Sequence, residues 1–213
     1  MKRLFDILSS SFALLVLCPL FIPIAIVLRC TGEGEVFYRQ NRVGKGGQVF
    51  GLYKFATMLK NSPAIGAGTI TLKDDPRVLP FGKFLRKTKL NELPQLLNIL
   101  FGHMSVVGPR PLTRETYEMI PPEIREKTKD LQPGLSGAGS LIFRDEERFI
   151  AEHPDDFREF YRDEIAPFKG QLEVWYLERK SFLLDMQLIF LTAWAVVFAH
   201  TTLPKKMLKD LPA

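Results

Sequence analysis

The sequence predicts an α+β protein that is mostly helical, with an N-terminal re-entrant membrane hairpin, one small β-hairpin and interfacial amphipathic helices. Three observations predict it: a proline-interrupted apolar run over residues 4–28, a glycine-rich turn between two β-type runs, and helical patterns after residue 113. A length of 213 residues suits one domain plus an attachment. We therefore divide the chain into a membrane hairpin, residues 1–29, and a catalytic domain with interfacial helices, residues 30–213.

The composition narrows the function classes. A net charge of +5 favours an anionic partner, and nucleic acid, an acidic membrane face and a phosphorylated substrate all fit. The two cysteines, Cys18 and Cys30, lie in or beside the most apolar segment, so they indicate neither a disulfide framework nor a metal site. The three histidines are scattered and give no support for zinc chemistry.

The apolar run at residues 4–28 is long enough to cross a bilayer core of roughly 30 Å. Pro19 and Pro23 interrupt it, and proline in a helix interior breaks or kinks the helix. Positive charge lies on both flanks, at Lys2 and Arg3 before the run and at Arg29 after it, and such residues prefer the cytoplasmic side. These features favour a helix broken at Cys18–Pro19 that enters the membrane and returns. A simple span is the alternative.

Two short strands are expected at residues 35–39 and 48–55, joined by a turn at residues 44–47 that contains three glycines. Basic side chains on this hairpin, Lys54 among them, give it a positive surface. A solvated edge and a surface for lipid head groups both explain these charges.

The whole chain is organised around residues 82–111. A basic run is followed by Asn91, a good helix N-cap, by Glu92 in the first turn and by Pro94 where a missing N–H costs little. Arg110 then stands between two prolines as a fixed guanidinium fork. These residues could hold a multiply negative group beside the Glu92 carboxylate. A capped helix with a solvated basic face explains them slightly better on chemistry alone.

Other acidic and glycine-rich stretches carry weaker signals. Asp74 and Asp75 before Pro76 suit a turn better than a metal site. The acids at residues 145–147 could ligate Mg²⁺, although an ion-paired helix start is favoured. The glycine-rich stretch at residues 131–140 would let backbone N–H groups approach a phosphate, but it matches neither a Walker loop nor a dinucleotide fingerprint.

The C-terminal half is expected to be helical. One or two polar helices are predicted at residues 113–128, and an amphipathic helix pair broken near Pro167 at residues 155–179. Residues 181–199 are apolar, short for a span and rich in aromatic side chains. This pattern predicts a helix lying in the head-group plane, and packing against the protein core is nearly as well supported.

Taken together, the motifs resemble those of the bacterial sugar transferases known as monotopic phosphoglycosyl transferases, in their small form. The resemblance covers almost the whole chain, and the most specific blocks are Glu92-Leu-Pro-Gln95 and Val107-Gly-Pro-Arg-Pro111. The other blocks are Phe37-Tyr-Arg-Gln-Asn-Arg-Val-Gly44, Tyr53-Lys-Phe-Ala-Thr-Met58, Asp75-Pro-Arg77, Pro133-Gly-Leu-Ser-Gly137 and Ser181-Phe-Leu-Leu-Asp185.

The resemblance implies transfer of a phospho-sugar from a UDP-sugar to polyprenol (undecaprenyl) phosphate with release of UMP, the first membrane step of glycoconjugate or polysaccharide assembly. It implies Mg²⁺, a phospholipid membrane and a monotopic position on the cytoplasmic face of the bacterial inner membrane. No nucleic-acid partner is then expected, and the apolar C-terminal helix permits a homodimer without requiring one.

Three departures from the family pattern matter. The family breaks its hairpin at Ser-Pro, whereas this chain has Cys18-Pro19, and it usually has an acid where His103 stands. The family carries Asp-Glu before Leu-Pro-Gln, with the Asp as covalent nucleophile and the Glu helping to bind Mg²⁺. This chain has Asn91-Glu92, and an amide is a poor nucleophile and a weaker metal ligand.

Four explanations of Asn91 are open. Another carboxylate, either Glu92 or one of the acids 145–147, takes the nucleophilic role; the lipid phosphate attacks directly; Asn91 is an engineered replacement; or the protein is a non-catalytic relative. We expect a working enzyme, with a catalytically impaired or non-catalytic binding relative as the alternative. The expected catalytic residues are Asn91, Glu92, Asp145 and Glu146. The expected phosphate-binding residues are Lys54, Arg86, Lys89 and Arg110, and the expected metal ligands are Glu92 and Asp75.

Overall fold

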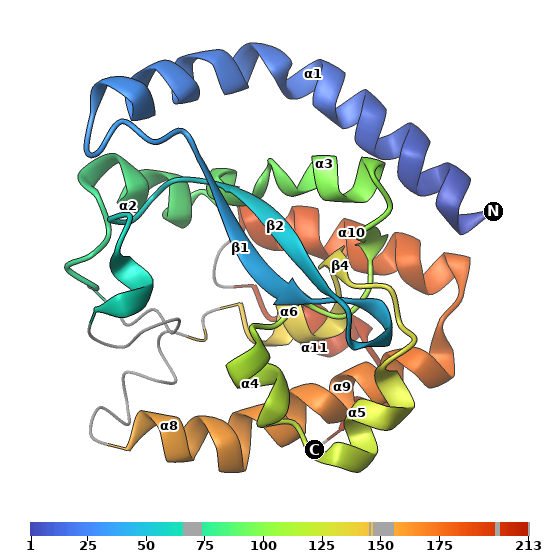
Figure 1. Cartoon of the computed structure of the whole chain (residues 1–213). Coiled ribbons are helices and arrows are strands. Elements are labelled where there is room, and N and C mark those ends of the chain that lie inside the picture. Colours follow the sequence, from blue (N-terminus) through green and yellow to red (C-terminus); the bar gives the residue numbers. More distant parts are fainter. Residues whose placement is uncertain (66–73, 145, 147–155, 199–200, 213) are drawn as a thin grey trace. The chain divides into compact units, whose positions relative to one another are not determined.

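The computed structural model describes residues 1–65, 74–144, 146, 156–198 and 201–212. The chain divides into two compact units. Unit 1 comprises Met1–Gln40 and Gly51–Gly102, and unit 2 comprises Asn41–Phe50 and His103–Ala213. The described elements are mostly helices, with one two-stranded hairpin and one further pair of short strands (Figure 1). The predicted class, a mostly helical α+β chain with a small β-hairpin, is confirmed.

Helix α1 (Lys2–Cys30) opens unit 1. The sequence predicts a break at Cys18–Pro19, but the structure has one helix that runs through both prolines. Figure 1 shows this helix bent in its middle part. A proline costs its helix a backbone hydrogen bond and can bend it without ending it, which explains a bend where a break was expected.

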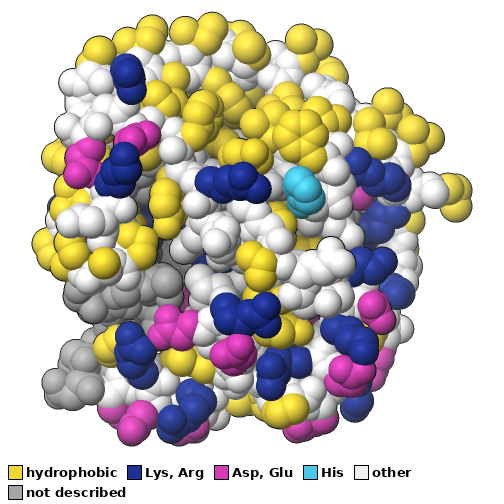
Figure 2. All heavy atoms as spheres, in the orientation of Figure 1, with side chains coloured by type: hydrophobic (Ala, Val, Ile, Leu, Met, Phe, Trp, Pro, Cys, Tyr) yellow, Lys and Arg dark blue, Asp and Glu magenta, His cyan; other side chains and the backbone are white. Residues whose placement is uncertain are grey.

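Most of the α1 surface is exposed and apolar, and Figure 2 shows hydrophobic side chains gathered along it. Its buried residues are Asp6, Ser10, Ile24 and Leu28. Large exposed side chains occur throughout: Leu4, Leu8, Phe12, Leu15, Val16, Leu20, Ile22, Ile26 and Val27. Among the described residues, α1 is the single helix that is long and apolar enough to cross a membrane.

The predicted hairpin is present as β1 (Phe37–Val43) and β2 (Val49–Phe55), with a 3₁₀ turn, η1 (Lys45–Gly47), between them. The first strand runs four residues further than predicted, because the alternation of side chains continues to the buried Val43. In unit 1, Asn98 of helix α3 (Gln95–Leu100) ties this helix to β2. Its Nδ2 donates to the Gly51 carbonyl at 2.8 Å and its Oδ1 accepts from the Tyr53 amide at 2.9 Å.

The rest of unit 1 is built from short helices: η2 (Ser62–Ala64), α2 (Pro80–Lys87), η3 (Leu90–Glu92) and α3 (Gln95–Leu100). Its core joins Ile24 and Leu28 of α1 to Phe55 and Leu85. Helix α1 also contacts α3, where the Arg3 guanidinium donates to the last carbonyl groups of the helix. This basic side chain supplies partners for carbonyl groups that have none within the helix.

Unit 2 contains a second small sheet, in which β3 (Ser105–Val107) pairs in parallel with β4 (Gly134–Ser136). The helices around it are α4 (Arg114–Glu118), α5 (Pro122–Thr128), α6 (Ala138–Ile142), α8 (Phe157–Phe160), α9 (Ala166–Arg179), α10 (Phe182–Val197) and α11 (Leu203–Met207). The sequence predicts one or two polar helices at residues 113–128, and the structure has two there, α4 and α5. The core of the unit gathers around Trp175, Leu188 and Leu191.

The helix before α9 contains one π-helical turn, η4 (Tyr161–Ile165). Pro167 follows it in the first turn of α9 and has no N–H to donate to a carbonyl of the preceding turn. The wider π turn therefore stands where the sequence predicts an interruption, and it buries Tyr161.

Helix α10 has two apolar faces. One packs into the core of unit 2 through Leu188, Leu191 and Ala195. The other exposes Phe182, Leu183, Phe190, Val196 and Val197. The prediction that this helix packs against the core is confirmed for the first face. That the second face lies in the plane of the lipid head groups stays a prediction.

Candidate functional site

The dyad turn, residues 89–93, carries Asn91 and Glu92 in unit 1. Lys89 adopts the left-handed conformation, with φ of 60°, and starts the 3₁₀ turn η3. The N-cap position of α3 is occupied by Pro94, so the prediction that Asn91 caps this helix is wrong. The left-handed residue turns the chain one step earlier than expected and places Asn91 inside the 3₁₀ turn.

Asn91 is 5 % exposed, and its Oδ1 has no hydrogen-bond partner among the described residues. An unpaired buried amide oxygen is costly, so this atom is suited to a ligand. Glu92 follows it directly and is half-buried. Amide and carboxylate oxygens are hard donors of the kind that Mg²⁺ prefers, and Mg²⁺ needs only one or two protein ligands when substrate phosphates complete the shell. The residues of the dyad turn therefore fit the ion that the resemblance implies.

Asp75 is engaged by Arg77, and both side chains are buried. Arg77 Nε donates to Oδ1 at 2.8 Å and Nη2 to Oδ2 at 2.5 Å, while Nη1 donates to the carbonyls of Ser62 and Ile65. The hydrogen bond that the Arg77 guanidinium donates to Asp75 raises the pKa of this guanidinium above its ordinary value. The structure gives Asp75 this structural role, and its role as a metal ligand stays a prediction. The described residues contain no group of three or more His, Cys, Asp or Glu side chains that could hold a metal.

Of the predicted phosphate-binding cations of unit 1, Lys54 and Arg86 are partly buried and Lys89 is exposed. Arg86 lies in the last turn of α2, with Nη1 3.8 Å from the Met58 sulfur. Lys89 is at the left-handed position, and Lys54 is in β2. Arg86 and Lys89 thus lie on either side of the short connection that leads from α2 into the dyad turn.

The Arg110 loop, residues 108–112, follows β3 in unit 2. Gly108 N donates to the Ser136 carbonyl at 2.9 Å, and Gly134 N donates to the Pro109 carbonyl at 2.7 Å. A Cβ on Gly108 would lie 2.1 Å from the Gln132 carbonyl oxygen, and one on Gly137 would lie 2.2 Å from that of Gly108. The glycine-rich stretch therefore serves close packing of two backbones, which places Arg110 at the end of β3.

The partly buried Glu146 contacts two buried polar residues, Lys169 on α9 and Tyr161 in the π turn. Its Oε1 accepts from Lys169 Nζ at 2.5 Å, and the same Nζ donates to the Tyr161 hydroxyl at 3.1 Å. Burial lowers the pKa of Lys169 and raises that of Tyr161, and Glu146 counters the first shift and adds to the second. Asp145, the other predicted acid, lies outside the described residues.

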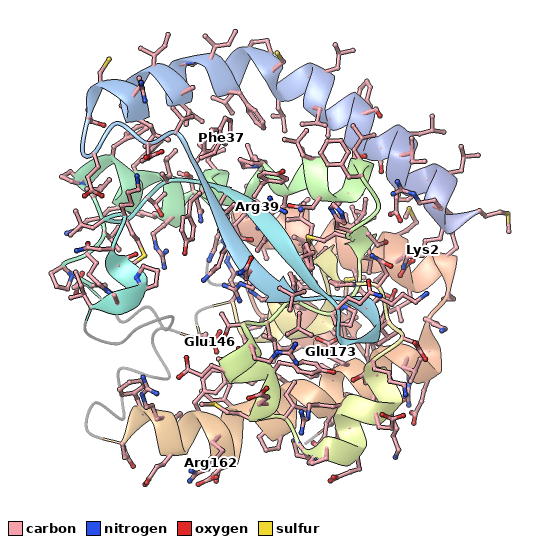
Figure 3. The ribbon with its side chains drawn as sticks, in the orientation of Figure 1. Lys2, Phe37, Arg39, Glu146, Arg162 and Glu173 are labelled. Carbon is pink, nitrogen blue, oxygen red and sulfur yellow. The ribbon has the colours of Figure 1, made fainter. Side chains whose placement is uncertain are left out.

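Glu173 stands one helical turn after Lys169 on α9, and Figure 3 labels it together with Glu146. Its Oε2 is buried and has no hydrogen-bond partner among the described residues. Burial raises its pKa to about 8, against the opposing effects of Lys169 and of a hydrogen bond from the Arg110 backbone. Sequence reasoning missed Glu173 and Lys169. A Glu and a Lys four residues apart usually indicate an exposed pair, and their burial could not be foreseen.

The chain belongs to the bacterial sugar transferase family, because the sequence model of this family matches residues 1–199. It is 35% identical over 196 residues to the exopolysaccharide production protein PSS of Rhizobium leguminosarum bv. phaseoli, covering 89% of this chain and 92% of that relative. A relative of this length at this identity shares the architecture of the whole chain.

Two further relatives are named for a reaction. The UDP-glucose:undecaprenyl-phosphate glucose-1-phosphate transferase of Klebsiella pneumoniae is 35% identical over 203 residues, covering 91% of this chain and 39% of that protein. The UDP-N-acetylgalactosamine-undecaprenyl-phosphate N-acetylgalactosaminephosphotransferase of Aeromonas hydrophila is 34% identical over 193 residues, covering 90% and 42%. The chain therefore spans about two fifths of each of these longer proteins.

Proposed function

We propose that this chain is a phosphoglycosyl transferase that moves a sugar-1-phosphate from a UDP-sugar to polyprenol phosphate and releases UMP. Family membership over residues 1–199 carries this proposal, because relatives that match about nine tenths of the chain are named for this reaction with undecaprenyl phosphate. Exopolysaccharide production, for which PSS is named, is a process that such a first membrane step would serve.

In the reaction an oxygen of the lipid phosphate bonds to the sugar-bearing phosphorus, and the bond from that phosphorus to the bridging oxygen breaks. The electron pair leaves with UMP, and the products are UMP and a polyprenyl diphosphate sugar. The amide of Asn91 is not a nucleophile. We therefore propose direct attack by the lipid phosphate, without a covalent intermediate on the protein.

Each unit carries candidate phosphate-binding groups of its own. In unit 1, Arg86 and Lys89 flank the connection to the dyad turn and would bind phosphate oxygens, with Lys54 of β2 as a further cation. In unit 2, Arg110 presents a guanidinium fork between two prolines, a group that pairs with phosphate in a bidentate way. Asn91 and Glu92 would hold Mg²⁺, which when bound neutralises charge on a diphosphate.

The proposal places the chain on a membrane. The exposed apolar side chains of α1 need an apolar environment, and a lipid acceptor must be reached there. With Lys2, Arg3 and Arg29 at the two ends of the helix, we propose that α1 enters and leaves on the cytoplasmic side, bent near Pro19. The chain would then be monotopic on the inner membrane, with the outer face of α10 in the head-group plane.

An assay of UMP release tests the activity. Full-length protein in nanodiscs is supplied with undecaprenyl phosphate, Mg²⁺ and a panel that includes UDP-glucose and UDP-N-acetylgalactosamine. Release that requires both the lipid phosphate and one UDP-sugar is expected. Arg110→Ala should lower turnover strongly, whereas Arg114→Ala, an exposed residue paired with Glu118 in the same unit, should not. If the protein binds a UDP-sugar but releases UMP from none of the donors in the panel, this result would favour a non-catalytic relative.

Kinetic order and intact mass test the route. Direct displacement predicts sequential kinetics and no added mass when the protein is incubated with donor alone. Ping-pong kinetics with a phospho-sugar adduct would overturn direct attack. Peptide mapping would then locate the adduct at Glu92, Glu146 or one of the neighbouring acids.

Accessibility labelling tests the topology. Single cysteines at Lys2 and Gly34, introduced into a Cys18→Ser and Cys30→Ser background, are treated with a membrane-impermeant maleimide in inverted and right-side-out vesicles. A re-entrant α1 predicts that both positions react from the cytoplasmic side. Reaction from opposite sides would show a span instead.

A further inference from the structure

The backbone of the Arg110 loop has partners at four of its polar groups. Beyond the contacts of Gly108 and Pro109 with the β4 strand, the Pro111 carbonyl accepts from Arg42 Nη1 at 3.1 Å and the Leu112 carbonyl accepts from Val43 N at 2.8 Å. These four contacts fix the two ends of the loop. They leave open what holds its centre, the residue whose side chain carries the guanidinium.

The centre of the loop has one backbone donor. Proline has no N–H, so the triplet Pro109-Arg110-Pro111 offers the N–H of Arg110 alone. That N–H is hydrogen-bonded to the Glu173 carboxyl. Glu173 lies on α9, far away in sequence, and so it ties the loop to this helix of unit 2.

The carboxyl of Glu173 fits where it lies because residue 139 is a glycine. A Cβ at Gly139 would stand 2.7 Å from Glu173 Oε1, well inside contact distance. Lys169, one turn earlier on α9, supplies the nearby positive charge, and its own ammonium is held by Glu146 and Tyr161. The second oxygen, Oε2, has no partner among the described residues, so the hydrogen bond to Arg110 is the specific contact that accounts for this buried acid.

We propose that Glu173 is a positioning residue: its carboxyl, admitted by Gly139, accepts the N–H of Arg110 and fixes this residue for a phosphate of the substrate. The inference rests on the proposed function for the role of Arg110 in binding phosphate. The bracing, by which we mean that the Glu173 carboxyl holds the Arg110 backbone, rests on the contacts within unit 2 alone. A guanidinium fork binds a phosphate best when its backbone does not move, because less freedom is lost on binding.

Amide hydrogen exchange tests the bracing without any turnover. In peptides that cover residues 108–112, only Gly108, Arg110 and Leu112 carry exchangeable backbone N–H groups, so Arg110 is resolved by tandem fragmentation. The Arg110 amide should be protected in the wild-type chain. Glu173→Leu should speed its exchange on the order of tenfold, and Glu173→Gln, which keeps an acceptor oxygen, should keep the protection. Glu178→Leu, the same change at an exposed position of α9, should leave it unaltered.

A second variant covers the case in which Glu173→Leu does not fold. Gly139→Ala adds one methyl group that must displace Glu173 Oε1, and it should also speed exchange at Arg110. An unprotected Arg110 amide in the wild-type chain, or unchanged protection in whichever of the two variants folds, would overturn the inference.

Measuring the activity of the same variants separates a failure of this inference from a failure of the proposed function. Glu173→Leu should lower kcat/KM for the UDP-sugar roughly ten- to a hundredfold, with Glu173→Gln close to wild type. Faster exchange with unchanged UMP release would overturn the positioning role and leave the proposed function intact. Absence of UMP release from the wild-type chain would refute the proposed function, while the exchange arm would still decide whether Glu173 braces the loop.

Discussion

The guanidinium of Arg77 holds both carboxylate oxygens of Asp75 in a buried, two-point ion pair, at 2.8 and 2.5 Å. The Arg77 amide also donates to Oδ1, and the remaining guanidinium nitrogen binds two carbonyls of the η2 segment. This pair therefore joins residues 62–65 to residues 75–77 within unit 1. A buried charge that loses its partner is far costlier than an exposed one.

The first prediction concerns stability. Asp75→Ala leaves the Arg77 charge buried without its partner and should lower the free energy of unfolding by about 3–5 kcal/mol. Urea unfolding followed by circular dichroism measures it. Lys60→Ala, which removes an exposed ion pair with Glu35 in the same unit, is the control and should change little. A small loss at Asp75 together with a weaker Mg²⁺ requirement for UMP release would instead assign this residue to the metal.

The second prediction concerns the buried amide of Asn91. Asn91→Asp supplies a carboxylate in the place of the unpaired Oδ1, so it adds both a nucleophile and a stronger ligand for Mg²⁺. UMP release should rise about tenfold, which corresponds to about 1.4 kcal/mol of barrier, with a change from sequential to ping-pong kinetics. Asn61→Asp, the same change at an exposed site of unit 1, should do neither. No adduct and no change of kinetic order would show that residue 91 does not approach the transferred phosphorus.

Much of the architecture is visible in the sequence because it repeats a pattern over many residues. The apolar run predicts the helix that became α1, and the glycine-rich turn between alternating strands predicts β1 and β2. Strands β3 and β4 could not be predicted, because each has three residues, too few for an alternation to show. Their pairing depends on glycines that admit a neighbouring backbone, which is a property of the folded chain.

The sequence identifies several residues of the candidate site, but it does not predict their conformations or contacts. The motifs single out Glu92 and Arg110, but they do not foretell that Lys89 is left-handed and moves Asn91 out of the cap position. They also give no sign that Asp75 is held by Arg77, since two residues this close in sequence suggest a solvated turn. Burial of charged groups depends on long-range packing and is the part that local patterns miss.

The third prediction concerns the close approach of two backbones in unit 2. A methyl group on Gly108 would meet the Gln132 carbonyl oxygen at 2.1 Å, and backbone atoms cannot turn aside as a side chain does. Gly108→Ala should therefore destabilise unit 2 by about 3 kcal/mol or more, at the upper end of the range for overpacking. Thermal unfolding followed by Trp175 and Trp194, both in unit 2, gives the measurement.

Gly46→Ala serves as the control for Gly108. It adds a methyl group where no atom lies within 4 Å, so only the positive φ of 65° resists it, at a cost of about 1–2 kcal/mol. An equal fall of Tm in the two variants would mean that the Arg110 loop and the β4 strand are less closely packed than the structure has them.

The fourth prediction concerns pH. Burial raises the pKa of Glu173 from 4.5 to about 8, so between these values the folded chain holds a proton that the unfolded chain has released. Unfolding then releases a proton, and stability falls as pH rises from about 4.5 to 8, by on the order of 1 kcal/mol per unit. The contribution is fully present below pH 4.5 and is lost above pH 8. Lys169, whose pKa is lowered by burial, contributes with the opposite sign at higher pH.

Glu173→Gln removes this proton and keeps the shape of the side chain. The variant should show a flatter dependence of Tm on pH across this window and should exceed the wild-type Tm at its upper end. Glu178→Gln, an exposed residue on the same helix, should follow the wild-type curve. Parallel curves for the wild type and Glu173→Gln would mean that the acid is already ionised at pH 5, in which case its bond to the Arg110 amide is a charged one and the loop is held more tightly than by a neutral carboxyl.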